Sequence, residues 1–307
     1  MLETVKLHGT RCAVCSTEGN ATELYPANFN SQAFSAAVFS ARRLPDRTHY
    51  RVVRCNTCGL VRSDPVADSD LLAQLYAQST FSYGDETANL KRTYGRYLAK
   101  LSDRAAEKQA LLEIGCGNGF FLEEALAQGY TTVRGVEPSI EALAQAKEEV
   151  RSGIVCDLLR YGLFEPEQFG VVCAFQVLDH VDNPGDVLDE CLRVMKPGGL
   201  MLAINHNVES LSARALKERS PIIDIEHTYL YSMATLSRVF TQHGFEVKQA
   251  GSVRNRYTLH YLTRLLPLPA GIKSAFLSFL AGNPIGRIPL SVPLGNLYLI
   301  AQKPTKI

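Results

Sequence analysis

Four of the eight cysteines lie in two closely spaced pairs near the start of the chain. The pairs are Cys12-Ala13-Val14-Cys15 and Cys55-Asn56-Thr57-Cys58. Because each C-x-x-C turn directs two sulfurs at one centre, two such turns offer the four ligands of a closed tetrahedral zinc site. We therefore expect a structural Zn²⁺ that helps a small element to fold. The alternative is a redox dithiol, which would need one C-x-x-C near a βαβ unit.

A glycine-rich run follows a short apolar run in the middle of the chain. Glycines stand at Gly115, Gly117 and Gly119, immediately before Phe120. Such glycines let a ligand approach backbone that a Cβ would obstruct. The spacing is G-x-G-x-G, which differs from the G-x-G-x-x-G that seats a dinucleotide pyrophosphate. The run by itself leaves the ligand open.

Polar residues follow at regular intervals after this run. Glu137 stands 22 positions after Gly115, and Asp157 stands 20 positions after Glu137, each where a strand is expected to end. A carboxylate in such a place can accept hydrogen bonds from both hydroxyls of a ribose. Gln176 ends the next expected strand. Because the carboxyl ends of parallel strands face one crevice, we expect these side chains to lie together.

The elements that position these residues alternate between strand and helix from Ala110 onward. The expected strands are 110–114, 131–136, 154–156, 171–175, 200–204, 245–249 and 297–302. The expected helices are 120–128, 186–195, 232–243 and one after Ser139 with Ile140, Leu143, Ala146 and Val150 on one face. Strands that are apolar on both faces and alternate with helices are typical of a parallel sheet covered by helices. The expected fold class is α/β, with a doubly wound, mainly parallel sheet.

Four sequence runs now resemble those of the class I S-adenosylmethionine-dependent methyltransferases, in order and at similar intervals. The runs are L-L-E-I-G-C-G-N-G-F, G-V-E-P-S, F-G-V-V-C-A-F-Q-V-L-D-H-V and R-V-M-K-P-G-G-L, and the likeness covers about Ala110 to Gln302. It implies a Rossmann-like methyltransferase fold that binds S-adenosylmethionine. A nicotinamide-binding Rossmann domain is the alternative.

The resemblance also implies roles for single residues. Gly115 and Gly117 would lie against the cofactor, and Glu137 would hold the ribose hydroxyls. Asp157 would lie near the adenine amino group, and Gln176 would line the methionine region. The same runs contribute three neighbouring candidates for cofactor binding, Glu113, Cys116 and Pro138.

The cysteine pairs ahead of such a domain resemble a smaller subset of methyltransferases. This subset includes sugar C-methyltransferases with an N-terminal zinc-binding module, and certain ribosomal RNA guanine methyltransferases show the same combination. We expect a zinc-binding module at 1–65, a helical connector at 66–108 and a methyltransferase domain at 109–307. Residues 252–296 would form a substrate-side insertion or lid before the last strand.

Candidate catalytic residues lie at the expected strand ends or just beyond them. They are His180, His206, His227 and Tyr229. A base is needed only if the methyl acceptor carries a proton at attack, and imidazole titrates near neutral pH. His227 is the preferred candidate because its H-x-Y-x-Y-S run resembles the substrate-side segment of small-molecule methyltransferases. For each histidine, a structural role in a loop is the alternative.

Two further patterns each allow two interpretations. Gln176-x-x-Asp179-His180 lies where some ubiquinone-pathway O-methyltransferases place E-x-x-E-H to hold a divalent metal, although a neutral Gln in place of Glu would weaken Mg²⁺ binding. Tyrosines of the connector could close over the cofactor or belong to the core. These tyrosines are Tyr83, Tyr94 and Tyr97.

Charge bears on the partner. Residues 41–62 hold six arginines, Arg42, Arg43, Arg47, Arg51, Arg54 and Arg62, against one acid, Asp46. Arginine forks match phosphate and carboxylate oxygens, so an anionic substrate or a phosphate backbone could dock there, and a solvated strand face is the alternative. The whole chain carries 32 basic against 31 acidic side chains, which disfavours a protein that coats nucleic acid.

Composition bounds the remaining possibilities. With 307 residues and 46% hydrophobic residues, the chain can bury a sizeable core. We expect no membrane span, since the uncharged late stretches fall short of the ~20 residues a bilayer requires. We see no secretory signal, which favours a cytoplasmic protein with reduced thiols.

These observations favour a methyltransferase that acts on a small anionic metabolite of sugar, nucleotide-linked or natural-product type. An RNA methyltransferase with an N-terminal zinc module is one alternative. A methyltransferase-like protein that binds the cofactor without turnover is another, because the glycine run and Glu137 bind cofactor and do no chemistry. The sequence leaves the oligomeric state and the methylated atom open.

Overall fold

The computed structural model describes residues 5–29, 34–35, 38–39, 47–79, 86–101, 110–266 and 268–305. At its centre lies a seven-stranded sheet with the order β12-β15-β10-β9-β6-β7-β8. The strands are β6 (Ala110–Ile114), β7 (Thr132–Val136), β8 (Ile154–Val155), β9 (Phe169–Phe175), β10 (Met195–His206), β12 (Glu246–Ser252) and β15 (Asn296–Gln302). The predicted α/β class and the mostly parallel sheet are confirmed.

The order of the strands reverses beside β6. From β6 the chain runs outward through β7 to β8, and then returns to the other side of β6 to form β9 and β10. These neighbours are parallel, and Ile114 of β6 lies opposite both Val136 of β7 and Ala174 of β9. Only β15 is antiparallel to its neighbours β10 and β12. A ligand crevice is expected outside the carboxyl ends of strands at such a reversal.

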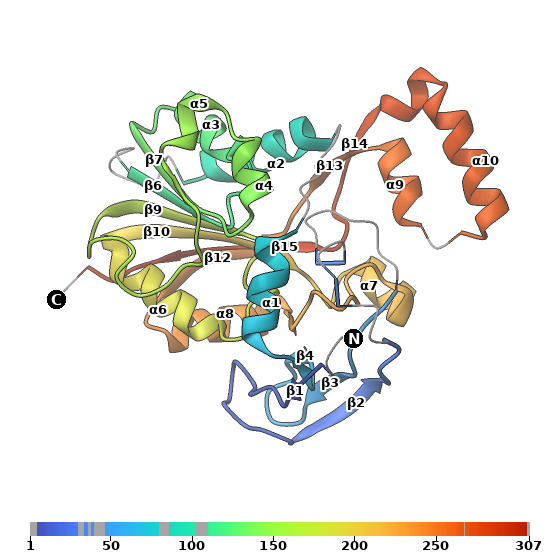
Figure 1. The fold of residues 1–307 in the computed structure, drawn as a ribbon, viewed down its shortest axis with the longest axis horizontal. Coiled ribbons are helices and arrows are strands. Elements are labelled where there is room, and N and C mark those ends of the chain that lie inside the picture. Colours follow the sequence, from blue (N-terminus) through green and yellow to red (C-terminus); the bar gives the residue numbers. More distant parts are fainter. Residues whose placement is uncertain are drawn as a thin grey trace.

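Helices cover both faces of the sheet, as Figure 1 shows. They are α2 (Thr87–Ala99), α3 (Phe120–Ala127), α4 (Ile140–Ala144), α5 (Glu148–Arg151), α6 (Pro184–Val194) and α8 (Met233–Gln242), whereas α1 (Ser69–Ala77) and α7 (Leu211–Leu216) pack against the N-terminal part. Their starts follow from capping residues. The side chain of Asn183 accepts the Gly185 N–H ahead of α6, and Ser232 forms a capping box with Thr235 in α8.

The single helix predicted after Ser139 is wrong. Ser139 does cap α4, but that helix ends at Ala144 and α5 begins only at Glu148. Lys147 between them is extended, which interrupts the helix and shifts the second turn out of phase with the first. Ile140, expected on the buried face, is 69% exposed, whereas Ala146 and Val150 are buried as expected.

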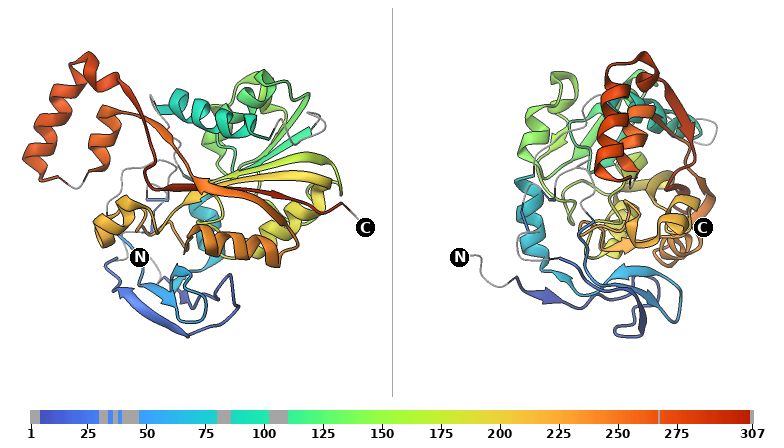
Figure 2. Two further views of the ribbon diagram at one scale, coloured as in Figure 1. Left: turned by 180° about the vertical axis from the view of Figure 1, so that it is seen from behind. Right: turned by 90° about the vertical axis from the view of Figure 1, so that its right-hand side faces the viewer.

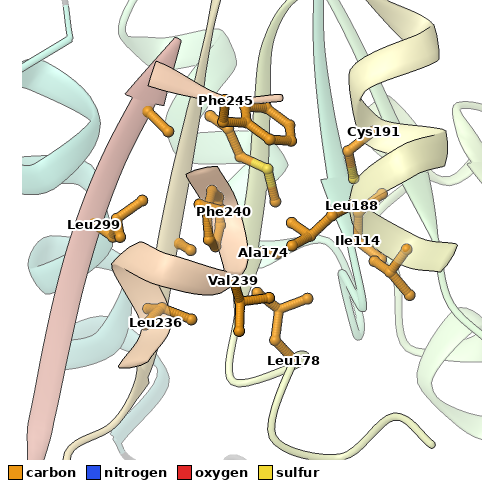
Figure 3. Close-up of a cluster of buried hydrophobic side chains, with 14 of the residues drawn as sticks. Ile114, Ala174, Leu178, Leu188, Cys191, Leu236, Val239, Phe240, Phe245 and Leu299 are labelled. Atoms are coloured by element: carbon orange, nitrogen blue, oxygen red, sulfur yellow. The ribbon is translucent and has the colours of Figure 1, made fainter. Parts of the chain in front are cut away.

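Two buried apolar clusters fill the space between the sheet and its helices. On the α8 side, Leu236, Val239 and Phe240 project onto the sheet, close to Leu178 and Leu299 (Figure 3). The opposite cluster takes in the connector, because Tyr94 and Tyr97 of α2 are buried there. Tyr94 stacks on Phe175 with ring centroids 4.3 Å apart. The core interpretation of these two tyrosines is thereby supported, and Tyr83 lies outside the described residues.

The N-terminal part is tied to the rest of the molecule by a shared sheet. One sheet contains its strands β2 (Ala21–Tyr25), β3 (Val52–Cys55) and β4 (Val61–Ser63). This sheet is extended by β11 (Tyr229–Leu230), which comes from a much later part of the chain. β1 (Leu7–His8) pairs separately with β5 (Val66–Ala67). The segment before the expected boundary at residue 65 is therefore hydrogen-bonded to a strand of the expected methyltransferase domain. Connector residues 102–108 lie outside the described residues.

Residues between β12 and β15 leave the body of the protein as a hairpin. It contains β13 (Asn255–Thr258), α9 (Leu259–Leu265), α10 (Ala270–Ala281), the 3₁₀ turn η4 (Pro284–Arg287) and β14 (Pro289–Val292). Within the described part of the chain, no helix has the length and apolar character needed to cross a membrane.

Removing the Phe240 ring should test the packing of α8. Phe240 is fully buried, so Phe240→Ala is expected to lower the free energy of unfolding by about 3–5 kcal/mol through lost burial and the cavity left behind. Chemical denaturation measures this change. The matched control is Phe276→Ala on the exposed face of α10, expected within about 0.5 kcal/mol of the parent. Equal losses in both variants would contradict the packing described.

Candidate functional site

The glycine loop between β6 and α3 has a backbone that only glycine adopts easily. Gly115, Gly117 and Gly119 have φ angles of 67°, 56° and 75°. A Cβ on Gly115 would lie 2.8 Å from a methyl of Val177. The loop is held against the neighbouring strand by the N–H of Gly115, which donates to the Val136 carbonyl at 2.8 Å. It forms a cradle of bare backbone at the reversal of the sheet.

Glu137 lies across from this loop at the end of β7. Its two carboxylate oxygens accept the N–H groups of Gly117 and Ser139, each at 2.9 Å. Burial raises the pKa of Glu137, while these two hydrogen bonds act in the opposite direction. A carboxylate has about four lone-pair sites, so one site on each oxygen is left for a ligand's hydroxyls. The geometry fits the ribose-binding role that the resemblance implied.

Glu113 lies one residue before the end of β6 and is only 2% exposed. Its Oε2 has no hydrogen-bond partner among the described residues. Burial, followed by repulsion from Glu137, raises its pKa well above the ordinary value. A buried carboxyl without a partner next to a glycine cradle fits a group that completes its hydrogen bonds when a cofactor is present.

The other four residues predicted to bind the cofactor lie in different environments. Gln176 follows β9 with a left-handed φ of 56°, a strained conformation for a side chain of this kind. Asp157 follows β8, but its carboxylate already accepts the Nε–H of Arg160 at 2.9 Å. The Cys116 side chain is buried, and Pro138 follows directly after Glu137. The contacts predicted for these four residues stay predictions.

A second cluster of polar side chains surrounds the fully buried Asp179, which follows β9. His206 at the end of β10 contacts one carboxylate oxygen through Nδ1 at 2.5 Å, and Asn205 donates to the other oxygen at 3.1 Å. Burial alone would raise the pKa of Asp179, but the adjacent His206, together with His180 and His227, lowers it well below the ordinary value. Asp179 is therefore a fixed negative charge.

His227 completes this cluster from a distant segment. Its ring centroid lies 4.4 Å from that of His206 and 4.8 Å from that of His180. Its Nδ1 lies 2.9 Å from the Ile222 carbonyl, which can only accept, so Nδ1 carries the proton and Nε2 keeps its lone pair. Burial and then the two other histidines lower the pKa of His227 well below 6.5. Neutral His227 can accept a proton at neutral pH.

The structure adds one residue that the sequence did not single out and separates one that it did. The hydroxyl of Tyr76 in α1 lies 3.1 Å from Nδ1 of His180. The sequence showed Tyr76 only as one apolar position of a helix. The hydroxyl of Tyr229 instead donates to the backbone carbonyls of Arg11 and Asp182, at 2.8 and 3.2 Å. The three predicted histidines are brought together, whereas the Tyr229 hydroxyl is occupied elsewhere.

Two groups of side chains could hold a metal ion. Cys12, Cys15, Cys55 and Cys58 have their sulfurs within 4.8 Å of one another, with two pairs at 3.3 and 3.4 Å. Sulfurs around a tetrahedral zinc at about 2.3 Å from the metal are spaced by roughly 3.8 Å, so the four thiols fit such a site. Asp179, His206 and His227 form the second group, which does not include His180 of the Gln176-x-x-Asp179-His180 pattern.

The predicted arginine cluster divides between several environments. Arg62 is fully buried, where its Nε–H donates to Thr10 at 3.0 Å, so it belongs to the interior and not to a docking surface. Arg51 pairs with Asp64. Arg54 lines a cavity of about 200 Å³ together with Arg214 and Lys217, and none of the described residues that line it is acidic. Arg42, Arg43 and Asp46 lie outside the described residues, and Arg47 is described.

Comparison with known proteins identifies the class of this fold and site. A family model described as a methyltransferase domain matches residues 87–250, just over half of the chain. A ubiquinone biosynthesis O-methyltransferase of Pseudomonas fluorescens (strain SBW25) is 38% identical over 105 residues, covering 32% of this chain and 45% of that protein. The enzyme of the same name from Pseudomonas aeruginosa (strain LESB58) is 30% identical over 165 residues, covering 49% and 71%.

Among solved structures, the cyclase SpnF shares the fold, with a TM-score of 0.52 at 17% identity and coverage of 78% of this chain and 98% of that one. The chain spans about half the length of the first curated relatives that it matches.

The chain belongs to the methyltransferase-domain family. The four sequence runs predicted this family.

The role of Glu137 can be tested by binding. Glu137→Ala is expected to weaken binding of S-adenosylhomocysteine at least tenfold, because even one hydrogen bond to a charged group contributes about 1.5–3 kcal/mol. Titration calorimetry measures the affinity, and thermal unfolding checks that the loop survives. The matched control is Glu165→Ala, an exposed acid outside the site, which should bind as the parent does. Unchanged affinity in Glu137→Ala would remove this residue from the ribose site.

Proposed function

We propose that this enzyme methylates a small anionic metabolite at an acidic O–H, N–H or C–H group, with His227 as the base. The observation that carries the proposal is the cluster of three histidines on Asp179. It lies at the same edge of the sheet as the glycine loop, because Gln176 and Asp179 both follow β9 and His206 ends β10. A proton acceptor is thereby held beside the predicted cofactor site.

The cofactor supplies a methyl group on a positively charged sulfur, and transfer is an in-line displacement that depends on alignment and a dry site. The chain's own residues account for proton removal. His227 accepts the proton at Nε2, since its Nδ1–H is engaged by Ile222. The new imidazolium then lies within reach of the negative field of Asp179, which stabilises it. Tyr76 and Asp179 hold His180 and His206 around this centre.

Charge near the histidine cluster supports an anionic acceptor. The cavity lined by Arg54, Arg214 and Lys217 also includes Ile222, whose carbonyl orients His227. An anionic group in that cavity would find three cations among otherwise neutral lining residues, and its remainder would extend toward the base. This arrangement favours a compact acceptor such as a sugar acid, a sugar phosphate or a nucleotide-linked compound.

A transfer experiment tests the class of acceptor. The enzyme with methyl-labelled S-adenosylmethionine and a cell extract should place label in small molecules that pass an ultrafiltration membrane and bind an anion-exchange resin. Label in RNA, released by ribonuclease, would support the RNA alternative and overturn the proposal. An extract without labelled product of either kind would also count against an anionic metabolite.

The base is tested with the labelled fraction as acceptor. His227→Ala should lower kcat by about 10²–10⁴-fold with unchanged S-adenosylhomocysteine binding, because only proton removal is lost. Since the pKa of His227 lies below 6.5 and its neutral form is active, the parent rate should hold to below pH 6.5 and then fall on further acidification. The matched control is His243→Ala, a histidine that pairs with Asp189 away from the site. Full activity in His227→Ala would eliminate His227 as the base.

We also propose that the four cysteines bind one structural Zn²⁺. The sulfur spacing supports this, and the β11–β4 pairing explains why a structural metal matters to activity. The strand that follows Cys58 carries Ser63, whose hydroxyl donates to the backbone carbonyl of His227 at 2.8 Å. Metal that fixes this turn would thereby fix the base. Thiolate ligands also require a reducing compartment, in accord with the expected cytoplasmic location.

Metal analysis tests the zinc site. The purified protein should contain about one zinc ion per chain, and Cys12→Ser should abolish it, because loss of one of four ligands opens the site. The matched control is Cys156→Ser, which removes an exposed cysteine outside the cluster and should leave the zinc content unchanged. A folded, active protein without zinc would contradict the proposal.

A further inference from the structure

Part of the hairpin between β12 and β15 stands away from the rest of the protein. β13 and β14 pair antiparallel and form its stalk, in which β13 packs against α2, and α10 packs against α9 and η4 to form its head. Tyr261 and Leu262 of α9 pack on the apolar cluster beside the sheet, whereas Figure 1 and the left view of Figure 2 show α10 clear of the central sheet and of the helices that cover it. α10 is therefore the part of the head that is open to a partner.

Exposed apolar side chains are concentrated on this hairpin. Of the thirteen large hydrophobic side chains that are exposed in the described part of the chain, eight lie between residues 266 and 294. They are Leu266, Ile272, Phe276, Phe279, Ile285, Ile288, Leu290 and Leu294. Single exposed apolar residues are ordinary on a protein surface, but a contiguous group marks a contact surface.

The apolar face of α10 is built into the helix. Ile272, Phe276 and Phe279 follow one another at spacings of four and three, which places them on one face. They are 52%, 55% and 60% exposed, whereas Leu280 is the buried residue of this helix. The less exposed positions of this helix, Lys273, Leu277 and Leu280, follow one another at spacings of four and three on the neighbouring face.

Charge on the hairpin has a single sign. Residues 252–296 contain no Asp or Glu and five cations, Arg254, Arg256, Arg264, Lys273 and Arg287. The whole chain has a net charge of +1, so everything outside this segment sums to −4 (+1 minus +5). Arg287 is exposed and stands between the exposed Ile285 and Ile288. The partner of this surface must accept apolar side chains and cations together.

We propose that the head of the hairpin docks on the surface of an anionic lipid bilayer. Phe276, Phe279 and Ile272 would enter the boundary between headgroups and acyl chains, and the cations would lie at the lipid phosphates. A second copy of the chain would place the cations of the head, Arg264, Lys273 and Arg287, against the same three cations, which disfavours self-association through this face. Nucleic acid would pair with the cations and leave the α10 face uncovered. Of these three occupants, the bilayer satisfies both features.

Docking would also orient the proposed acceptor site. The N–H of Asn207, next to His206, donates to the Gly295 carbonyl at the base of the stalk, at 2.7 Å. The stalk therefore leaves the body beside the strand end that carries the histidine cluster. As a consequence that rests on the proposed function, an acceptor at or near the membrane would reach this edge directly.

Vesicle sedimentation tests the docking surface. The full chain should sediment with vesicles made of equal parts phosphatidylglycerol and phosphatidylcholine, more weakly with phosphatidylcholine alone, and less as salt is raised. The double variant Phe276→Ser/Phe279→Ser should reduce binding to the anionic vesicles at least tenfold. A charge variant, Lys273→Glu/Arg287→Glu, should reduce it as well and remove the salt dependence.

The matched controls are Leu211→Ser and Tyr161→Ser, which change exposed apolar residues outside the hairpin and should bind as the parent does. Three outcomes would overturn the proposal: no binding to either vesicle, unchanged binding in the Phe276/Phe279 variant, or a dimer in light scattering that this variant converts to monomer. Because vesicle binding needs no acceptor, its failure is distinguishable from failure of the proposed function.

Discussion

The buried negative charge of Asp179 constrains the architecture of the proposed acceptor site. A carboxylate without exposure is costly unless its oxygens and its charge are both satisfied. Asn205 and His206 provide side-chain partners from β10, and the Asp179 carbonyl receives the N–H groups of Thr228 and Tyr229. One residue thus joins the loop after β9, the end of β10 and the start of β11. If any of these segments packed differently, the Asp179 carboxylate would lose hydrogen-bond partners and would remain charged in an apolar interior.

The same junction explains why the N-terminal part is not an appendage. Tyr229 donates one of the two N–H groups held by the Asp179 carbonyl, and it pairs with Arg62 of β4 in the shared sheet. The module that holds the cysteines is thereby linked by backbone hydrogen bonds to the loop that carries His227. Because β4 pairs with β11, disorder in the cysteine cluster would displace the loop that carries His227, the proposed base. A structural metal distant from the chemistry can in this way govern catalysis through position.

The features that the sequence predicted and the features that it missed lie on different sides of the site. The cofactor side lies in continuous runs, where the strand-loop-helix pattern fixes the geometry locally. The positions of Gly115 and Glu137 at the ends of β6 and β7 were predicted correctly, and their contacts with the cofactor stay predictions. The proposed acceptor side is assembled from distant segments. Nothing local to Tyr76 indicates that it contacts His180, and nothing local to Tyr229 indicates that Arg11 and Asp182 occupy its hydroxyl. The break before α5 was missed because Lys147 departs from helical geometry without a Gly or Pro to announce it.

This division has a consequence for specificity. The residues predicted to contact the cofactor are held by the sheet itself, since moving Glu137 would disturb both the loop and the segment after β7. The residues of the proposed acceptor side lie on loops and on the edges of added elements, namely the cysteine module, the segment from α7 to β11, and the stalk of the hairpin. Such elements can change in length and charge without loss of the core. The identity of the acceptor is therefore encoded in the parts of this chain that lie outside the sheet, where the exposed cations and apolar side chains are also gathered.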